Sequence, residues 1–385
     1  MNIADLRVAL FSGNYNYVRD GANQALNRLV EFLLRQGAHV RVYSPKVENP
    51  AFECAGDLVG LQNFPIPGRA EYRFPLGLSA EARRDLEAFA PNVVHVASPD
   101  VSGHRAVSWA RERGLPVLAS VHTRFETYPR YYGMAFLEPL AVAILHRFYN
   151  RCDALVAPSE SMVDVLREQR MNDDVSVWSR GVDRSIFSPA RRDTAWRQSL
   201  GIADDEVAVG FLGRLVMEKG LDVFSDTIQL LKTRGVPHRV LVVGEGPAGD
   251  WFRDKVPDAV FAGFQGGADL GRAVASMDLL LNPSITETFG NVTLEAMACG
   301  IPVVAARATG STSLVQDGVT GRLVEPGDIP GFADAVGAYL TDSGLRHAHG
   351  AAGEARSLDF SWDAINSTVA DAYLRLLDRR QRAAA

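Results

Sequence analysis

Short apolar runs that alternate with segments of helical periodicity constrain the fold of this 385-residue chain more than any other feature. Val8–Phe11 is the first such run, and apolar residues then recur at helical spacing over 26–34 until Gly37 ends the pattern. The same order returns with further apolar runs at 39–43, 92–96, 116–121 and 154–157. A repeated strand–helix–strand order predicts a parallel sheet with right-handed crossovers.

A break in this pattern divides the chain in two. The segment Gly181–Pro189 interrupts the first series, and a second series of apolar runs begins at 207–212. A chain of this length is too long for one ordinary core and suits two domains of roughly 150–200 residues each. The sequence therefore predicts an α/β fold with parallel-sheet domains over 1–182 and 183–360, followed by an amphipathic helix within 361–385.

Composition excludes several classes of protein. Apolar residues make up 47% of the chain and charged residues 22%, which is typical of a globular domain. The net charge of −6 argues against a nucleic-acid binder. Three widely spaced cysteines fit neither a disulfide framework nor a zinc site, and the first predicted strand leaves no room for a signal peptide. No apolar run reaches the ~18 residues of a membrane-spanning helix. We therefore expect a cytoplasmic protein.

Two glutamates flank the start of a predicted helix in the second series. Glu287 follows the apolar run 279–283, and Glu295 lies eight positions later on the helix itself. A helix start offers unpaired N–H groups and the positive end of its dipole to phosphate or sugar oxygens. A carboxylate on the loop can accept hydrogen bonds from sugar hydroxyls, and one two turns later can hold a ribose. Taken singly, each glutamate is more typical of a solvated surface charge.

This region resembles the donor site of family 4 glycosyltransferases. The resemblance rests on the spacing of the two glutamates, the Phe289–Gly290 pair and the stretch 295–304. These are retaining enzymes of the GT-B fold, in which two Rossmann-like domains face each other and a terminal helix returns to the first. The resemblance implies that Glu287 holds a hydroxyl of the donor sugar and that Glu295 binds the nucleotide ribose. It also implies donor binding, through backbone amides, by Phe289, Gly290, Asn291 and Val292.

A second motif, Gly213–Gly220, contains two cations in a strand-to-helix connection. Arg214 can contact two oxygens of a diphosphate with its planar fork, and Lys219 can act as a point charge. Either residue alone could be an ordinary surface charge. The resemblance implies that this loop, with Gly213, is the family's diphosphate site. We expect these charges to replace a divalent metal, so that the nucleotide-sugar is the substrate and neither a cofactor nor a metal is required.

Two residues of the first domain complete the expected site. Gly21 lies in the loop after the first predicted strand, and the resemblance implies that it approaches the donor diphosphate; plain loop flexibility is the alternative. His122 follows the run 116–121, where ligands of open α/β sheets bind. Alone it would more often be structural, but family members carry a histidine here beside the reacting centre. The expected catalytic residues are therefore His122, Arg214, Lys219 and Glu287.

Aromatic and basic residues suggest an acceptor side. We expect this side to include Tyr15, Tyr17, Arg124, Tyr128, Arg130, Tyr131 and Tyr132. Such a patch suits an anionic lipid surface, a polar acceptor or simple packing, and the sequence leaves the three open. The apolar segment 133–145 is either an interfacial or a buried helix. Residues 46–77 show no clean period, and we expect an irregular excursion there.

The sequence thus predicts a retaining glycosyltransferase that transfers a hexose from a UDP- or GDP-sugar to a hydroxyl acceptor. A membrane lipid is the favoured acceptor, as in sulfoquinovosyl-diacylglycerol synthases, which carry a similar His-Thr motif; peripheral association with the inner face of the cell membrane would follow. A soluble or polysaccharide acceptor is an alternative, and so is a non-catalytic sugar-nucleotide-binding subunit. A sugar-nucleotide epimerase of the same fold would lack the full set of paired glutamates and Gly-Arg…Lys. No nucleic-acid partner is expected.

Overall fold

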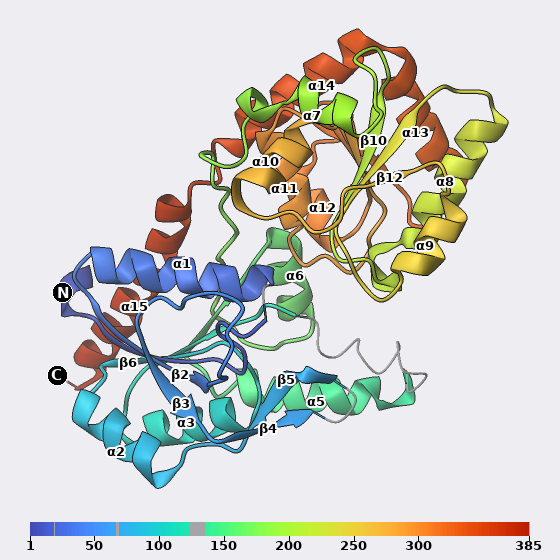
Figure 1. The fold of residues 1–385 in the computed structure, drawn as a ribbon. Coiled ribbons are helices and arrows are strands. Elements are labelled where there is room, and N and C mark those ends of the chain that lie inside the picture. Colours follow the sequence, from blue (N-terminus) through green and yellow to red (C-terminus); the bar gives the residue numbers. More distant parts are fainter. Residues whose placement is uncertain (19, 67–68, 124–134, 385) are drawn as a thin grey trace. The chain divides into compact units, whose positions relative to one another are not determined.

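The computed structural model describes residues 1–18, 20–66, 69–123 and 135–384 (Figure 1). The chain forms two compact units. The first comprises Met1–Ser179 together with Trp362–Ala385, and the second comprises Arg180–Ser361. The last helix of the chain therefore belongs to the first unit. Among the described residues, no helix combines the length and the apolar character needed to cross a bilayer.

A seven-stranded parallel sheet forms the centre of the first unit. In spatial order its strands are β3 (Asp57–Leu61), β2 (His39–Pro45), β1 (Arg7–Phe11), β6 (Val93–Val96), β7 (Val117–Ser120), β8 (Ala154–Ala157) and β9 (Val175–Val177). The chain runs outward from β1 to β3 and then returns to β6 on the other side of β1. The strand order therefore reverses between β1 and β6, and open α/β sheets bind ligands at the carboxyl ends beside such a reversal.

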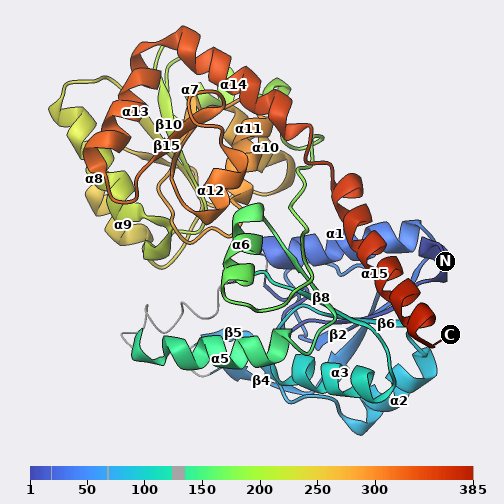
Figure 2. The ribbon, with the colours of Figure 1, turned by 180° about the vertical axis from the view of Figure 1, so that it is seen from behind.

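Helices cover both faces of this sheet (Figures 1 and 2). They are α1 (Gly21–Arg35), α2 (Ala80–Phe89), α3 (Val101–Glu112), α5 (Glu138–Tyr149), α6 (Glu160–Glu168) and α15 (Trp362–Ala384), with short 3-10 turns at Ile3–Asp5 and Ala135–Leu137. Helix α15 lies beside α1. Four of the five residues of β1 are fully buried, as expected for a parallel strand covered on both faces.

The expectation of an irregular segment over 46–77 is wrong. Strand β3 pairs in parallel with β2, and β4 (Asn63–Ile66) forms an antiparallel hairpin with β5 (Arg69–Pro75). These strands showed no clean alternation because most described side chains of β3 and β4 are only partly buried or exposed. When neither face of a strand is fully buried, hydrophobic and polar residues need not alternate along it, so the sequence shows no period of two.

The second unit contains a six-stranded parallel sheet. In spatial order its strands are β12 (Val260–Phe261), β11 (Arg239–Val243), β10 (Ala208–Leu212), β13 (Leu279–Asn282), β14 (Val303–Ala306) and β15 (Gly321–Val324). The chain runs from β10 outward to β12 and then returns to β13 beside β10. The order of this sheet therefore reverses between β10 and β13.

Two hydrophobic clusters, one on each face, hold this sheet to its helices. The helices are α7 (Thr194–Ser199), α8 (Leu221–Thr233), α9 (Gly249–Lys255), α10 (Gly267–Ala275), α11 (Asn291–Ala298), α12 (Thr309–Leu314), α13 (Ile329–Thr341) and α14 (Ser343–Ser357), with 3-10 turns at Pro189–Arg191 and Met217–Lys219. Val240 and Val242 of β11 pack in the cluster with α8, α9 and α13, whereas Leu241 and Val243 pack in the cluster with α10 and α11. This alternation follows the period of two of a strand.

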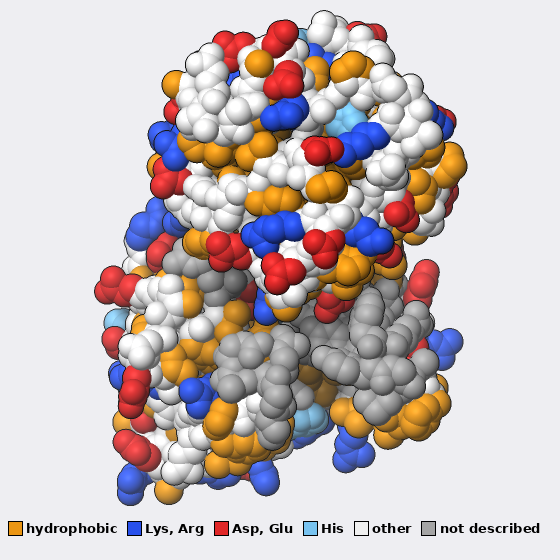
Figure 3. All heavy atoms as spheres, turned by 45° about the vertical axis from the view of Figure 1, so that its right-hand side comes forward, with side chains coloured by type: hydrophobic (Ala, Val, Ile, Leu, Met, Phe, Trp, Pro, Cys, Tyr) orange, Lys and Arg blue, Asp and Glu red, His pale blue; other side chains and the backbone are white. Residues whose placement is uncertain are grey.

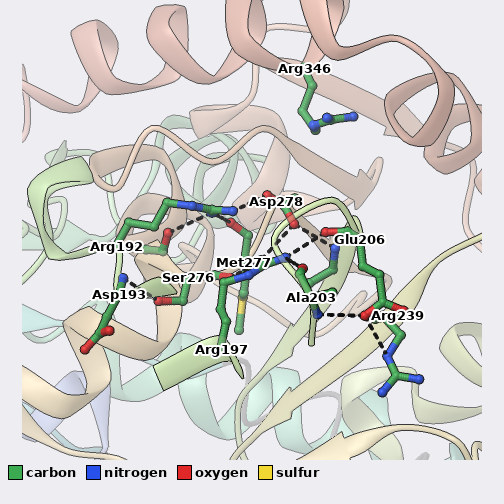
Figure 4. Close-up of polar contacts among 12 residues, drawn as sticks. Arg192, Asp193, Arg197, Ala203, Glu206, Arg239, Ser276, Met277, Asp278 and Arg346 are labelled. Carbon is green, nitrogen blue, oxygen red and sulfur yellow. Dashed lines mark hydrogen bonds and ion pairs between the residues drawn. The ribbon is translucent and has the colours of Figure 1, made fainter. Parts of the chain in front are cut away.

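A fully buried arginine links α7 to the β-sheet of the second unit (Figure 4). Nη1 of Arg197 donates to the carbonyl of Ser276 at 2.7 Å and lies 2.9 Å from Oδ2 of Asp278. Its Nη2 donates to the carbonyl of Glu206 at 2.7 Å. The same carboxylate oxygen of Asp278 accepts a hydrogen bond from the backbone of Ala208 at 2.7 Å. The Arg197 side chain thus satisfies polar groups from two separate segments, 203–206 and 276–278.

We predict that Arg197→Met lowers the free energy of unfolding by about 3–5 kcal/mol, because it removes one of the two arginines paired with the mostly buried Asp278 and leaves the carbonyls of Ser276 and Glu206 without this donor. Chemical denaturation of the wild type and the variant measures this difference. The matched control is Arg234→Met, which removes an exposed ion pair with Asp334 and should cost at most about 1 kcal/mol. Equal losses in the two variants would contradict a special role for the buried pair.

Candidate active site

Two loops meet at the carboxyl ends of β10 and β13, where the strand order of the second sheet reverses. The carbonyl of Glu218 accepts hydrogen bonds from the hydroxyls of Ser284 at 3.4 Å and Thr286 at 3.2 Å, which joins the loop after β10 to the loop after β13. Gly220 ends the first loop with φ of +71°, and a Cβ there would lie 3.0 Å from the carbonyl oxygen of Pro283. A larger residue at this position would therefore push the two loops apart.

The side chains of Lys219 and Glu287 form an ion pair across these loops. Nζ of Lys219 lies 2.5 Å from Oε1 of Glu287, and the two side chains are 30% and 15% exposed. Both residues were predicted to be catalytic, and the structure brings them together. Arg214, on the same loop as Lys219, is exposed and makes no side-chain hydrogen bond or ion pair with any described residue. The site thus combines a paired cation, an unpaired cation and one carboxylate.

Helix α11 starts beside this ion pair. Its N-cap is Gly290, with φ of +96°, which has no side chain to cap the helix. The buried side chains of Asn282 and Thr293 hydrogen bond at 3.1 Å and hold the helix start to the end of β13. The N–H groups of Asn291 and Val292 make no hydrogen bond to other described residues. Such N–H groups at a helix start are suited to an anion, and the sequence-based expectation that they bind the donor stays a prediction.

The side chain of Phe289 is buried in a hydrophobic cluster, with its ring 5.9 Å from that of Phe360. Only the backbone of Phe289 is therefore available to a ligand. Gly213, which starts the loop after β10, donates its N–H to the carbonyl of Val243 at 3.0 Å and so fixes the origin of that loop.

Glu295 lies on α11, eight positions after Glu287. Burial and, to a smaller extent, the negative charge of Glu287 together raise the pKa of Glu295 to about 8. Glu295 is therefore mostly protonated at neutral pH, so that it can donate a hydrogen bond as well as accept one.

A third loop, which follows β14, lies at this edge of the sheet. The N–H of Gly310, on α12 after β14, donates to the carbonyl of Glu287 at 2.9 Å. A Cβ at Gly310 would lie 2.8 Å from the same carbonyl oxygen, so only glycine allows this contact. Among the described residues, no group of three or more His, Cys, Asp or Glu side chains could hold a metal ion.

His122 lies in the first unit, two residues beyond the end of β7, and is partly buried. Its Nε2 is 2.8 Å from Oγ of Ser120, the last residue of β7. Its ring packs edge-on against Trp178, with the ring centroids 5.5 Å apart. His122 is therefore held from two sides at the carboxyl edge of its sheet.

The other residues expected in the first unit have structural partners. Gly21 is the first residue of α1, but the carboxylate of Asp20 caps this helix by accepting from the N–H of Asn23 at 2.8 Å. A diphosphate at Gly21 would meet that carboxylate. Tyr15 is fully buried and donates its hydroxyl to the carbonyl of Ala55 at 2.9 Å, so it stabilises the fold and is not presented to an acceptor.

Tyr17 is 9% exposed and donates to the carbonyl of Gly13 at 2.5 Å. Its side chain is therefore also mostly buried within the first unit. The remaining residues expected on the acceptor side lie outside the described residues: Arg124, Tyr128, Arg130, Tyr131 and Tyr132.

The raised pKa of Glu295 predicts a loss of stability as the pH rises. Between the ordinary glutamate pKa and about 8, the folded protein keeps a proton that the unfolded chain releases, so the free energy of unfolding falls over this window. Glu295→Gln should flatten this fall and should melt above the wild type at pH 8. Thermal unfolding from pH 5 to pH 9 measures the effect. The exposed Glu168→Gln is the control and should follow the wild-type curve.

Two sequence profiles match the chain, one in each half. Residues 19–186 match the profile described as Glycosyltransferase Family 4, and residues 206–342 match Glycosyl transferases group 1. Among solved structures, sucrose-phosphate synthase from Thermosynechococcus elongatus superposes with a TM-score of 0.81 at 21% identity, over 97% of this chain and 99% of that one. This likeness confirms the predicted GT-B fold.

Relatives with assigned activities extend over nearly the whole chain. A GDP-mannose-dependent alpha-mannosyltransferase of Mycolicibacterium smegmatis is 32% identical, covering 99% of this chain and 100% of its own length. The sulfoquinovosyl transferase of Arabidopsis thaliana is 29% identical, covering 94% of this chain and 72% of its own. The chain belongs to glycosyltransferase family 4, and it is an enzyme that transfers a sugar from a nucleotide-sugar.

Proposed function

We propose that this enzyme transfers a hexose from a UDP- or GDP-sugar to a hydroxyl group of a membrane lipid, with retention of the anomeric configuration. The observation that carries the proposal is the ion pair between Lys219 and Glu287 beside the uncapped start of α11. This arrangement offers positive charge to a diphosphate and a carboxylate to the sugar hydroxyls. A GDP-mannose-dependent relative at 32% identity makes GDP-mannose the first donor to test.

In this proposal, the cations stabilise the leaving group. As the bond between the sugar and the diphosphate breaks, negative charge develops on the phosphate and positive charge on the sugar. Lys219, Arg214 and the N–H groups of α11 would stabilise the departing phosphate, an electrostatic effect that requires no metal. Glu287 would orient the sugar through its hydroxyls while it keeps Lys219 in place.

Retention would follow from a displacement on one face of the sugar. The acceptor hydroxyl forms the new bond on the face from which the diphosphate leaves, and its proton passes to the departing phosphate oxygen. Glu287 is a poor covalent nucleophile because Lys219 already holds its carboxylate at 2.5 Å. His122 would contribute a hydrogen bond near the reacting centre, and Glu295 a hydrogen bond to the ribose.

We predict that Lys219→Ala lowers kcat/KM for the nucleotide-sugar on the order of 100-fold or more, because the departing phosphate loses one fixed positive charge. Release of the nucleoside diphosphate, followed in the presence of EDTA, measures this change and tests the absence of a metal requirement. The matched control is Lys232→Ala, which breaks an ion pair with Asp258 in the same unit. The control should retain wild-type activity. A Lys219→Ala enzyme of normal rate would remove this residue from the site.

An exposed apolar surface of the first unit supports a lipid acceptor. Three side chains at helical spacing along α5 and the turn before it are open to solvent: Phe136 at 77%, Leu140 at 58% and Ile144 at 51%. The exposed Arg147 continues the same face by one further turn. The hairpin β4–β5 of the same unit carries a further exposed aromatic side chain, Phe64 at 43%.

Apolar side chains with neighbouring basic ones suit the boundary of an anionic bilayer. In Figure 3, hydrophobic side chains gather along the lower edge of this unit, with Lys and Arg side chains among them. The segment 133–145, for which the sequence left a buried and an interfacial helix open, therefore includes an exposed apolar face. This face supports the interfacial alternative.

We predict that the double variant Leu140→Ser, Ile144→Ser binds vesicles of phosphatidylcholine and phosphatidylglycerol roughly 10- to 100-fold more weakly than the wild type. Cosedimentation measures the binding. Because both side chains are exposed, the variant should fold and should still release the nucleotide from the donor. Val319→Ser, an equally exposed apolar residue of the second unit, is the control.

Incubation with a labelled nucleotide-sugar tests the class of acceptor directly. Label in the lipid extract supports the proposal, whereas label only in water-soluble glycan supports a soluble or polysaccharide acceptor. Tight donor binding without turnover would indicate a non-catalytic subunit.

A further inference from the structure

A chain of hydrogen bonds connects the last helix of the protein to His122. The hydroxyl of Tyr373, on α15, lies 2.5 Å from Nδ1 of His95 on β6. Nε2 of His95 lies 2.8 Å from Oγ of Ser120 on β7, and the same Oγ lies 2.8 Å from Nε2 of His122. All four residues belong to the first unit. Apart from His122, none of them was expected from the sequence to have a role.

The inner members of this chain are shielded from water. Tyr373 and His95 are fully buried, and Ser120 is 2% exposed. Burial lowers the pKa of His95 to about 3, so its ring is neutral and carries one proton on one of its two nitrogens. Burial raises the pKa of the Tyr373 hydroxyl, which therefore keeps its proton.

These protonation states fix the direction of the hydrogen bonds. Among the described residues, Nδ1 of His95 is the only recorded hydrogen-bond partner of the Tyr373 hydroxyl. The hydroxyl must donate to this nitrogen, because a buried donor without an acceptor is costly. His95 then carries its proton on Nε2 and donates to Ser120. The Ser120 hydroxyl has one hydrogen, and it donates that hydrogen to Nε2 of His122.

The opposite direction leaves a buried group unsatisfied. If Nε2 of His122 donated to Ser120, the serine would donate to Nε2 of His95, and Nδ1 of His95 would donate to Tyr373. The phenolic hydrogen of Tyr373 would then have no acceptor among the described residues. If Nε2 of both histidines donated to Ser120, the serine oxygen could accept both bonds, but its own hydrogen would then have no recorded acceptor among the described residues. The same obstacle applies to a protonated His122.

We propose that Ser120 is a positioning residue that holds His122 as the neutral tautomer with its proton on Nδ1. The inference rests on the proposed placement of His122 beside the transferred sugar. In this tautomer Nε2 already accepts a hydrogen bond, and Nδ1–H is a donor. His122 therefore presents Nδ1–H as a hydrogen-bond donor, and its Nε2, which already accepts from Ser120, does not serve as a general base.

Helix α15 also fixes the plane of the His122 ring. Nε1 of Trp178 donates to the side chain of Asn366 on α15 at 3.2 Å, and Trp178 packs edge-on against both His122 and His95. Asn366 and Tyr373 are seven residues apart and so lie on one face of the helix. One helix face thus supports both the ring contact and the hydrogen-bond chain.

The test combines nitrogen NMR with kinetics. Long-range ¹H–¹⁵N spectra of protein labelled at histidine, with His122 assigned from a His122→Gln variant, should show Nδ1 protonated and Nε2 unprotonated at neutral pH. Ser120→Ala should shift His122 toward the Nε2–H tautomer and lower kcat roughly 3- to 10-fold, with little change in KM for the donor. Ser120→Thr keeps the hydroxyl and should restore both readouts.

Ser44→Ala is the matched control. Ser44 is a fully buried serine of β2 in the same sheet, and its hydroxyl has no hydrogen-bond partner among the described residues. Its removal should change neither the tautomer nor kcat. A His122 in the Nε2–H form in the wild type, or an unchanged tautomer in Ser120→Ala, would overturn the inference. Because the NMR readout needs no turnover, a failure to find any sugar donor would count against the proposed function alone.

Discussion

The meeting of two loops at the strand reversal of the second sheet is the constraint on which the candidate donor site depends. Parallel strands deliver their following loops to one edge of the sheet, and the reversal between β10 and β13 leaves those two loops as direct neighbours. Hydrogen bonds to the carbonyl of Glu218 and the close approach at Gly220 hold the loops in contact. The ion pair between Lys219 and Glu287 is a consequence of this backbone arrangement.

The charges of the site favour an anion. Glu295 is mostly protonated at neutral pH because its pKa is raised to about 8, so it adds little negative charge. Glu287 is balanced by Lys219, which leaves the unpaired Arg214 and the positive end of α11. In the proposed site a nucleoside diphosphate would supply the missing negative charge, and its sugar would reach the Glu287 carboxylate. If the donor binds there as proposed, its binding and the protonation of Glu295 would be coupled through Glu287.

The sequence predicted the second unit better than the first. Its strands and site loops can be recognised locally, as with β13 and the loops that carry Lys219 and Glu287. A buried strand followed by a glycine-rich turn needs only a few consecutive residues to be identified from the sequence. The hairpin β4–β5 was missed because most of its described side chains are only partly buried or exposed and show no hydrophobic period. Tyr15 was wrongly expected on the acceptor side for a different reason. The carbonyl that accepts its hydrogen bond belongs to Ala55, forty residues away in the sequence.

The hydrogen-bond chain to His122 lay beyond any local pattern, since Tyr373 and His95 are 278 residues apart in the sequence. His95 alone looks like a polar interruption of an apolar strand, and Tyr373 looks like one apolar position of a terminal helix. The Tyr373 hydroxyl and Nδ1 of His95 are both buried, and each is the hydrogen-bond partner of the other. The docking of α15 and the hydrogen bonding of β6 therefore depend on each other. A terminal helix that returns to the first unit therefore does more than cover the sheet. When α15 is docked, the hydrogen bond from Tyr373 determines which nitrogen of His95 carries the proton. As a result, the Ser120 hydroxyl donates its hydrogen to His122.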